Sequence, residues 1–482
     1  MAIGPPVPTC TGAQILENPQ ATRIFGVIAR LVVGNRATDI VDFHQPLAIH
    51  YVKVVATRTR AQPHFTRQGS VMTVGAAPTS VFDAELPTLT YGAQETPGEV
   101  YPRLQAAQRQ GPIALGPFGP EVLSYHLVRS VLRDTRFQIP PGINLLVQGV
   151  TSGPLWDKVV NSLLCLEGDA HHRLRSLTSK AFTPRATLRL HDTMADVMNE
   201  LVDRMADAGR CDVVTDLARP YPVPIICALL GAPREDWQQF SLWADDVFKA
   251  FSFTVDVREI EPDVMRAWGE LDDYVDDMVA RRRHSLTDDL LSDLIRAEDD
   301  GDRLSTAELR MLAGGLLLAG TDTTRNQVAA SVHVLCEHPE QWGLLKENPQ
   351  LAMRAVEETM RHSPIACGTL RLVVEDADLD GYLFPAGTMV LVNTAAANRD
   401  PAVYDDPDRV DITREGAPPI LTFGGGVHYC LGANLARREI AEALNVIASR
   451  LLNPRAAGPV PWKPMVSLSG PKSLPIEFDT ER

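Results

Sequence analysis

The chain has 482 residues, of which 45% are hydrophobic, and this is enough for one large domain or for two or three average ones. Its formal net charge of −15 argues against nucleic acid as the main partner, because an acidic surface repels phosphate groups. The seven cysteines are scattered and no two are spaced as C-x-x-C, so neither a disulfide framework nor a zinc site is indicated, and a reducing, cytoplasmic location is expected.

The first 85 residues differ from the rest and form a predicted N-terminal extension, 1–85, of unknown role. They combine short apolar runs with a basic section between Lys53 and Arg67. The start of the chain lacks the basic region and apolar core of a secretory signal. The most apolar early stretch, 24–33, is about half the length of a membrane span and contains Arg30, so no transmembrane segment is predicted.

The remainder, 86–482, is predicted to be one mainly α domain with small β-sheets. Apolar residues recur with helical spacing in six segments, and three short runs have the character of strands. The predicted helices are 186–208, 235–251, 262–283, 306–336, 350–362 and 431–452, and the predicted strands are 370–375, 388–392 and 473–478.

The helix predicted over 306–336 has an unusual centre. Ser305 and Glu308 form a capping box at its start, and at 1.5 Å per residue it extends about 46 Å, enough to cross a domain. Three glycines interrupt its apolar middle, each at a cost of about 1 kcal/mol relative to alanine. Asp322 and Thr323 follow directly, in a polar run that disfavours a buried helix. Such a local cost indicates a functional site, and the alternative is a polar patch against a neighbouring helix.

The helix predicted over 350–362 contains a charged pair. Asn348 and Pro349 suit the N-cap and first positions of a helix. Glu358 and Arg361 are three residues apart, so they lie on one helix face and can pair. Glu-x-x-Arg occurs by chance about twice in a chain of this size, so taken alone it is equally explained by a surface ion pair.

The most specific pattern is Phe-x-x-Gly-x-x-x-Cys-x-Gly, which runs from Phe423 to Gly432 around Cys430. Three consecutive glycines predict a tight turn or a close approach to something bulky. At the start of the following helix, the dipole and free N–H groups are expected to favour the thiolate form of the cysteine. By composition, the pattern arises by chance in roughly one such chain in a thousand. A held thiolate beside such a turn suits an axial iron ligand, and the alternative is a buried loop cysteine.

The cysteine loop, the 358–361 pair and the run Ala-Gly-Thr-Asp-Thr-Thr over 319–324 resemble those of the cytochrome P450 family of haem-thiolate monooxygenases. The resemblance is to soluble bacterial members and is continuous over 86–482. It implies the cytochrome P450 fold, with a long central helix across the haem. It also implies haem b, iron protoporphyrin IX, as cofactor and Cys430 as the ligand of the iron. In this family, electron donation from the sulfur favours O–O cleavage.

The resemblance implies roles for other residues. Thr323 is expected to hydrogen-bond dioxygen and Asp322 to take part in proton delivery, where the family's helix opens or bulges. Arg409 is expected to join the 358–361 pair as a third arginine, although Val410 follows it where the family usually has Phe. His172 stands where the family usually has threonine. Side chains expected to bind the haem propionates are His171, Arg175, Arg371 and His428.

The implied activity inserts one oxygen atom from O2 into a hydrophobic small molecule, such as a lipid, sterol, terpenoid or polyketide-like compound. Mostly apolar pocket walls are predicted over 140–164, 240–253, 313–323 and 365–370, and near Gly470. No flavin or nicotinamide motif occurs, so a separate ferredoxin and ferredoxin reductase are expected to supply electrons at a cationic face near the cysteine loop. Candidates for that face are Arg173, Lys180, Arg185, Arg437 and Arg438.

Two alternative functions are consistent with a haem-thiolate protein. A peroxide-driven enzyme needs no electron-donating partner, but enzymes of that type tend to lack the acid–alcohol pair. A haem-based gas sensor or ligand carrier has no turnover and therefore no need for proton delivery. The presence of both Asp322 and Thr323 favours the monooxygenase over either alternative.

Overall fold

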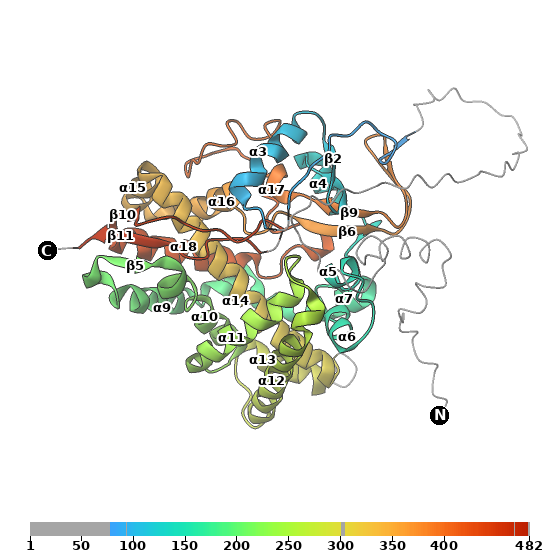
Figure 1. Cartoon of the computed structure of the whole chain (residues 1–482). Helices are drawn as coiled ribbons and strands as arrows, with labels where there is room; N and C mark the ends of the chain where they lie inside the picture. The colour runs from blue at the N-terminus through green and yellow to red at the C-terminus, as the bar shows by residue number, and fades with distance from the viewer. Residues whose placement is uncertain (1–77, 93, 300–303, 467, 481–482) are drawn as a thin grey trace, which may run out of the picture.

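The computed structural model describes residues 78–92, 94–299, 304–466 and 468–480, most of them in helices (Figure 1). The fold is mainly α with small β-sheets, which confirms the predicted class. Most of the predicted extension, 1–77, lies outside the described residues. Its remaining part contributes β1 (Thr79–Ser80), which pairs in parallel with β8 (Tyr382–Phe384), and buries Val81 completely.

Each of the six segments predicted as helical contains a helix, with shifted ends. The prediction for α12 was wrong at its start, because the Asp256 side chain accepts from the Arg258 N–H at 2.9 Å and caps the helix before Pro262. The helices are α3 (Pro97–Gln108), α4 (Tyr125–Val131), α5 (Asn144–Val147), α6 (Pro154–Val160), α7 (Gly168–Thr178), α8 (Pro184–Leu188), α9 (His191–Asp203), α10 (Pro222–Leu230), α11 (Trp237–Phe248), α12 (Val257–Arg283), α13 (Leu290–Asp299), α14 (Thr306–Glu337), α15 (Pro339–Glu347), α16 (Ala352–His362), α17 (Thr394–Ala397) and α18 (Ala433–Arg450).

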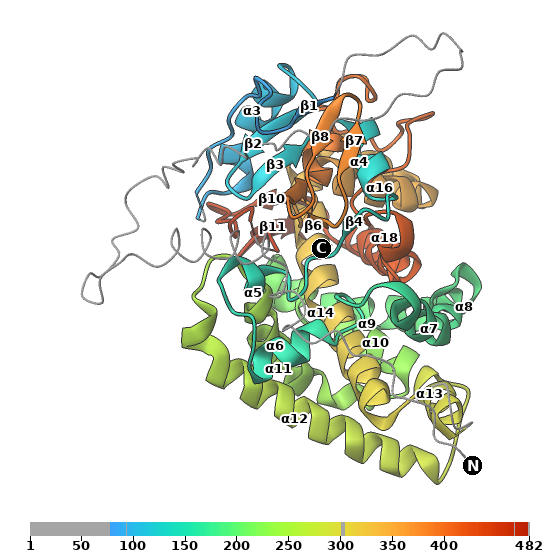
Figure 2. The same ribbon diagram turned by 90° about the vertical axis from the view of Figure 1, so that its right-hand side faces the viewer.

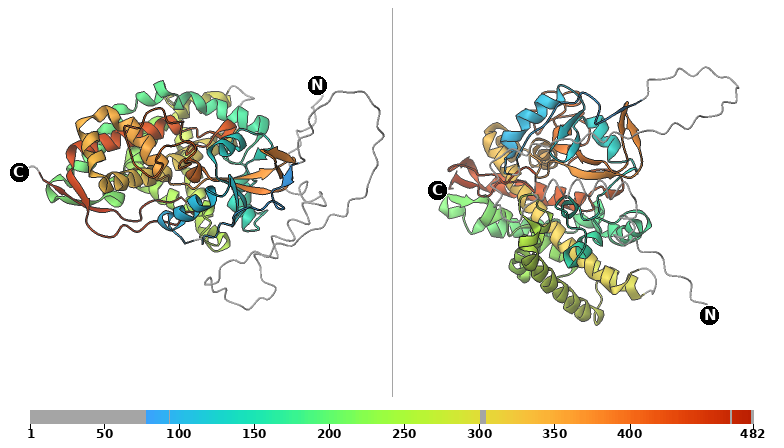
Figure 3. Two further views of the ribbon diagram at one scale, coloured as in Figure 1. Left: turned by 90° about the horizontal axis from the view of Figure 1, so that it is seen from above. Right: turned by 45° about the vertical axis from the view of Figure 1, so that its right-hand side comes forward.

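The largest sheet has five strands in the order β2-β3-β9-β6-β4. Strand β6 runs antiparallel to β9 and places Arg371 opposite Val390. The C-terminal sheet, β10-β11-β5, lies at the other end of the molecule from the strands drawn in orange and blue (Figure 3). The remaining strands are β2 (Ile113–Gly116), β3 (Gly119–Val122), β4 (Phe137–Gln138), β5 (Arg210–Asp212), β6 (Thr369–Val373), β7 (Ala377–Leu379), β9 (Met389–Val392), β10 (Leu452–Ala456) and β11 (Pro475–Asp479).

Helix α14 is the long central helix that the sequence predicts. Figure 2 shows it running through the middle of the molecule, with α12 on one side and strands of the sheets on the other. It packs against α10, α11, α12, α16 and α18, so both of its ends and most of its faces are covered. Side chains from residues distant in sequence therefore meet along this helix.

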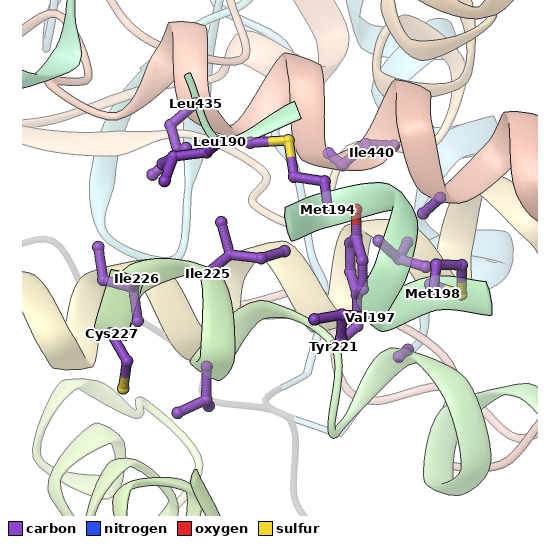
Figure 4. Close-up of a cluster of buried hydrophobic side chains, with 14 of the residues drawn as sticks. Leu190, Met194, Val197, Met198, Tyr221, Ile225, Ile226, Cys227, Leu435 and Ile440 are labelled. Atoms are coloured by element: carbon purple, nitrogen blue, oxygen red, sulfur yellow. The ribbon is translucent and has the colours of Figure 1, made fainter. Parts of the chain in front are cut away.

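The largest apolar core lies where α9, α10 and α18 meet (Figure 4). Met194 and Met198 of α9 lie near Ile225 of α10 and Ile440 of α18 in that view. The Tyr221 hydroxyl is buried in the same core and is satisfied, as a buried polar group must be, by a 2.8 Å hydrogen bond to the backbone carbonyl of α18. This packing fixes α18, which follows directly on the cysteine loop.

The three glycines of α14 differ in what surrounds them. A Cβ on Gly320 would lie 3.0 Å from Ile226 Cγ1, so this glycine lets α10 approach closely. A Cβ on Gly314 would make an ordinary 3.5 Å contact with Leu271 of α12. A Cβ on Gly315 would have no atom within 4 Å among the described residues, and this residue is exposed. Protein packing therefore explains Gly320 but not Gly315.

Among the described residues, one apolar stretch, Val213–Leu230, passes a length and composition test for a membrane span, with a mean hydropathy of 1.4. It is not one continuous helix, because a π-helix, Val213–Ala218, is separated from α10 by a turn. Within the fold 72% of the stretch is buried, as expected for a core segment.

Candidate active site

The loop that carries Cys430 is fixed by its backbone. The Cys430 N–H donates to the Phe423 carbonyl at 2.9 Å. Gly424 and Gly426 have φ values of +72° and +65°, which side chains disfavour. A Cβ on Gly426 would lie 2.2 Å from the Leu132 carbonyl oxygen. The close approach predicted for the glycines is thus to the end of α4, and it sets the position of the loop.

The Cys430 side chain is accessible to solvent although it lies deep among protein atoms. Burial raises the pKa of its thiol, while the Gly432 N–H and the positive charges of Arg175 and Arg437 act in the opposite direction without prevailing. The Gly432 N–H thus favours the thiolate, as expected at the start of a helix, but in the protein alone desolvation outweighs it. A metal ion that binds the sulfur replaces its proton.

One face of α14 is accessible in the middle of the fold. Gly315, Ala319 and Thr323 follow at intervals of four residues, and each is more exposed than most of the residues around it. The Thr323 hydroxyl donates to the Ala319 carbonyl at 2.9 Å. The helix is continuous here, so the opening that the family resemblance predicts is not present in this structure. The Thr323 hydroxyl therefore lies on the accessible face of α14.

Asp322 points to the other side of α14, where it is buried. Arg325, one turn later, forms ion pairs with both Asp322 and Asp245 of α11, and Asp245 also pairs with Arg219. Burial disfavours the charge of Arg325, but the two carboxylates outweigh this and raise its pKa. Burial likewise opposes the charge of Asp245, and Arg325 and Arg219 lower its pKa in spite of it.

Two further side chains hold the backbone of this turn. Asn326 Nδ2 donates to the Asp322 carbonyl at 2.7 Å, and Lys463 Nζ donates to Asn326 Oδ1 at 2.7 Å. The sequence-based reasoning missed these residues and Arg325. The spacing of Asp322 and Arg325 is a local signal that could have identified that pair, whereas nothing local points to Asp245.

The structure brings two of the four predicted propionate ligands into contact. The rings of His171 and His428 have centroids 4.4 Å apart. His171 is buried, and neither of its ring nitrogens has a hydrogen-bond partner among the described residues. His172 is exposed, so the inward histidine is His171. Burial, and then the charges of His428 and Arg175, lower the pKa of His171 to about 4.

The two predicted arginine ligands donate hydrogen bonds to uncharged groups. Arg371 is 4% exposed, and its Nη1 donates to Thr369 Oγ1 at 2.7 Å and to the Leu370 carbonyl at 2.8 Å. Burial lowers its pKa to about 10, although the charge of Glu167 opposes this. Arg175 donates to the Tyr429 carbonyl, and burial lowers its pKa. Neither arginine forms an ion pair with a carboxylate among the described residues.

These residues fit a haem. Among the described residues, one buried and one partly buried guanidinium group without carboxylate partners and a buried imidazole without a hydrogen-bond partner suit two propionates, which need cations and donors. An accessible cysteine sulfur is a soft ligand suited to iron. The fit rests on the chemistry of these donors.

An unforeseen carboxylate lies among the donors. Glu167 accepts from His428 Nε2 at 2.9 Å and from the Ile139 N–H at 2.8 Å. Burial opposes the charge of Glu167, but these hydrogen bonds lower its pKa. Glu167 is the N-cap residue of α7, a position where an acidic residue is ordinary, so no pattern in the sequence assigns it to the site.

The predicted charged pair beneath the loop is present and buried. Arg361 Nε and Nη2 donate to the two carboxylate oxygens of Glu358, each at 2.8 Å. The choice of Arg409 as third arginine was wrong, because its side chain is 62% exposed and pairs with Asp411. Arg409 contributes only its carbonyl, which accepts from Arg361 at 3.0 Å. Arg414 takes the predicted place, with its Nε 3.4 Å from Glu358 Oε2.

The candidate cations for a docking face divide into two kinds. Arg173 pairs with Glu308, and Arg437 pairs with Glu357 and stacks on Phe423, with Cζ 4.3 Å from the ring centroid. These two therefore have structural partners. The candidates that are at least partly exposed and form no ion pair among the described residues are Lys180, Arg185 and Arg438.

Comparison with known proteins gives consistent matches. The family model described as Cytochrome P450 matches residues 158–451, a segment that contains every candidate residue for haem binding and proton delivery. Luteothin monooxygenase of Streptomyces thioluteus is 36% identical over 380 residues, which cover 78% of this chain and 92% of the relative. Mycinamicin IV hydroxylase/epoxidase of Micromonospora griseorubida is 40% identical over 371 residues, covering 75% and 90%.

A solved structure has the same fold. The cytochrome P450 PksS of the bacillaene polyketide synthase of Bacillus subtilis 168 superposes with a TM-score of 0.71 at 28% sequence identity. The match covers 81% of this chain and 100% of that one. The sequence relatives and this structure thus agree over the same large part of the chain.

Proposed function

Because this chain belongs to the cytochrome P450 family and is a haem-dependent monooxygenase, we propose that it oxygenates a hydrophobic small molecule with electrons from a separate ferredoxin and ferredoxin reductase. One oxygen atom enters a C–H or C=C bond of the substrate. The other becomes water, with two electrons and two protons. The observation that carries the proposal is the accessible cysteine in a loop held by its own backbone, within the segment that matches the family.

In this proposal Cys430 Sγ binds the iron, and bound haem supplies oxygen activation, which a thiolate ligand favours. His171, Arg175, Arg371 and His428 hold the propionates. The support is chemical, since Arg371 has no carboxylate partner and His171 no partner at all among the described residues.

Thr323 and Asp322 are assigned to proton delivery. The Thr323 hydroxyl lies on the accessible face of α14, where it can exchange its bond to Ala319 for one to bound oxygen or water. Asp322 is an ionisable group on the neighbouring position of the same turn, so a proton can pass between the two sides of the helix.

The substrate is proposed to be a bulky, polyketide-like molecule. The pocket walls assigned from sequence include Leu316, Ile365 and Leu370, which are apolar and largely buried. Gly315 and Ala319 leave the accessible face of α14 without bulk, which makes room for a large ring system. PksS, which has the same fold, is described as belonging to a polyketide synthase.

The ferredoxin is proposed to dock beside the cysteine loop. Val427 and Tyr429 of this loop are 44% and 38% exposed, and apolar side chains at this level of exposure suit a contact surface. Lys180 and Arg185 are exposed on segments that pack against α18. Cations around an apolar centre steer an acidic partner. A cytoplasmic location goes with this proposal, because the described cysteines are free thiols.

A reduced carbon monoxide difference spectrum tests the haem-thiolate assignment. The expected Soret band lies at about 450 nm, the signature of thiolate ligation in this family. Cys430→Ser removes that band, whereas the control Cys211→Ser, at a partly buried cysteine of β5, keeps it. A band at about 420 nm in well-folded native protein contradicts the assignment.

Electron supply is tested with the native protein and O2. Turnover should require a ferredoxin, its reductase and reduced nicotinamide, and omission of the ferredoxin should abolish it. Efficient turnover with hydrogen peroxide alone contradicts the proposed electron route and favours the peroxide-driven alternative.

A further inference from the structure

Two helices that border the site are joined by a buried row of charges. Arg325 of α14 contacts Asp322 on its own helix and Asp245 on α11. The side chains of Arg325 and Asp322 are only 11% and 7% exposed. Asp245 also pairs with Arg219, so two cations and two anions alternate from the centre of α14 to the start of α10. The pair of Arg325 with Asp322 lies in the interior, away from screening by salt, whereas the side chains of Asp245 and Arg219 are 30% and 35% exposed.

Stability does not explain this row. Charged groups lose hydration on burial, and apolar residues of the same volume often stabilise a fold as well or better. The row also has an open position, because Arg325 Nη1 is buried and has no hydrogen-bond partner among the described residues. Buried polar atoms are nearly always paired. An unpaired donor beside an acid assigned to proton delivery suits a bound water, which would complete the row.

We propose that Arg325 is a positioning residue for Asp322, and that Asp245 sets the position of Arg325 from α11. This inference rests on the proposed role of Asp322 in proton delivery. A guanidinium presents several donors in a rigid plane, so one arginine can hold two carboxylates in fixed directions. If Arg325 is no longer held by Asp245, the geometry of the Arg325–Asp322 pair changes. The carboxylate of Asp322 then loses its fixed orientation.

The C-terminal end of α11 is joined to a predicted wall of the pocket. A 3-10 turn, Lys249–Phe251, follows α11 directly. Asn144 Nδ2 of α5 donates to the Ala250 carbonyl at 2.7 Å and to the Ser252 carbonyl at 3.0 Å. Gln148 Oε1 accepts from the Val257 N–H at 2.9 Å. The segment after α11 is thus fastened to a loop that is predicted to line the pocket.

Three variants test the inference in the haem-loaded enzyme: Arg325→Gln, Arg325→Lys and Asp245→Asn. The measurements are the fraction of electrons that reach product, the release of hydrogen peroxide, the solvent isotope effect on turnover and the substrate Kd. Arg325→Gln should lower the product fraction by about three-fold or more and raise the isotope effect, with Kd within about two-fold, because proton delivery fails while the pocket is intact. Arg325→Lys should restore part of the product fraction, and Asp245→Asn should act in the same direction as Arg325→Gln.

A matched control uses another ion pair of α14. Arg310 Nε donates to Asp276 Oδ1 of α12 at 2.7 Å, which is also a pair between α14 and a neighbouring helix. Arg310→Gln should leave the product fraction and isotope effect unchanged. If Arg325→Gln does not fold, as judged by thermal unfolding and the thiolate Soret band, Arg325→Lys and the nearly isosteric Asp245→Asn decide the question.

Asp322→Asn separates the two proposals. If Asp322→Asn leaves the product fraction unchanged, the proposed function of this acid fails, and the positioning role falls with it. If Asp322→Asn lowers the product fraction while the folded Arg325 and Asp245 variants match native protein, the positioning inference alone is overturned.

Discussion

The imidazole of His171 lies against that of His428, with ring centroids 4.4 Å apart. His428 has a hydrogen-bond partner in Glu167, whereas His171 has none among the described residues. The two rings therefore differ in what they can still bind. His171 thus keeps both ring nitrogens available, and in the proposed function a haem propionate takes one of them.

His171→Phe should weaken haem retention while preserving the ring packing. Loss of one hydrogen bond to a charged group costs about 1.5–3 kcal/mol, so the rate of haem loss should rise roughly ten-fold or more. Transfer of haem to an excess of apomyoglobin measures this rate. His172→Phe, at the exposed neighbour, is the control and should leave the rate unchanged. Equal rates for the two variants would falsify the assignment of His171.

Gly315→Ala should keep or raise stability, and Gly315→Phe should exclude large ligands. A Cβ at this position meets no atom within 4 Å, and alanine is favoured over glycine in a helix by about 1 kcal/mol. Spectral titration with a small and a bulky azole measures the space beside this face. Gly315→Phe should weaken the binding of the bulky azole alone, by roughly ten-fold or more, because the phenyl ring fills the accessible face.

Gly269 provides the matched control for Gly315, since it is a helical glycine of α12 whose Cβ would also meet nothing within 4 Å. Gly269→Phe should not change the affinity of either azole. If Gly315→Phe binds the bulky azole as native protein does, the accessible face of α14 is not a pocket wall.

Arg414→Ala should destabilise the protein more than Arg409→Ala. Arg414 is the cation beside the buried Glu358, and its removal leaves that carboxylate less compensated, at a cost of about 1–3 kcal/mol. Arg409 is 62% exposed, and loss of its pair with Asp411 should cost less than about 1 kcal/mol. Urea unfolding measures both. The opposite order would restore Arg409 as the third arginine.

Glu439→Gln should flatten the dependence of stability on pH. Burial raises the pKa of Glu439 from an ordinary 4.5 to about 8, although a hydrogen bond from Thr324 opposes this. The folded carboxyl therefore stays protonated where the unfolded one ionises, and native protein loses stability as pH rises from 4.5 to about 8. The gap between the two pKa values corresponds to at most about 5 kcal/mol.

The measurement is the free energy of unfolding of native and Glu439→Gln protein at several pH values. Glutamine cannot ionise, so the variant should gain on native protein as pH rises through that window and differ least at its lower end. Glu340→Gln, at an exposed position of α15, should follow native protein at every pH. Parallel curves for native and Glu439→Gln protein would show that this carboxyl does not titrate in the fold.

Local patterns were enough to predict the central helix, the Glu358–Arg361 pair and the cysteine loop. In each case the interacting groups lie within a few residues of one another, so helix periodicity or a short spacing brings them together whatever surrounds them. The loop prediction also included a close approach, which the contact between Gly426 and the Leu132 carbonyl confirms. The sequence did not indicate that α4 is the element approached.

The sequence by itself therefore determined the elements that carry the site and the family to which the chain belongs. Only the tertiary structure decided which side chains complete the site: Arg414 in place of Arg409, the carboxylate of Glu167 beside His428, and the pairing of Asp245 with Arg325. Asp245 and Arg325 are 80 residues apart and on different helices. Their contact depends on how α11 packs on α14, and no local spacing encodes that packing. The pKa of Cys430 also depends on the tertiary structure, because burial raises it against the local effect of the helix start.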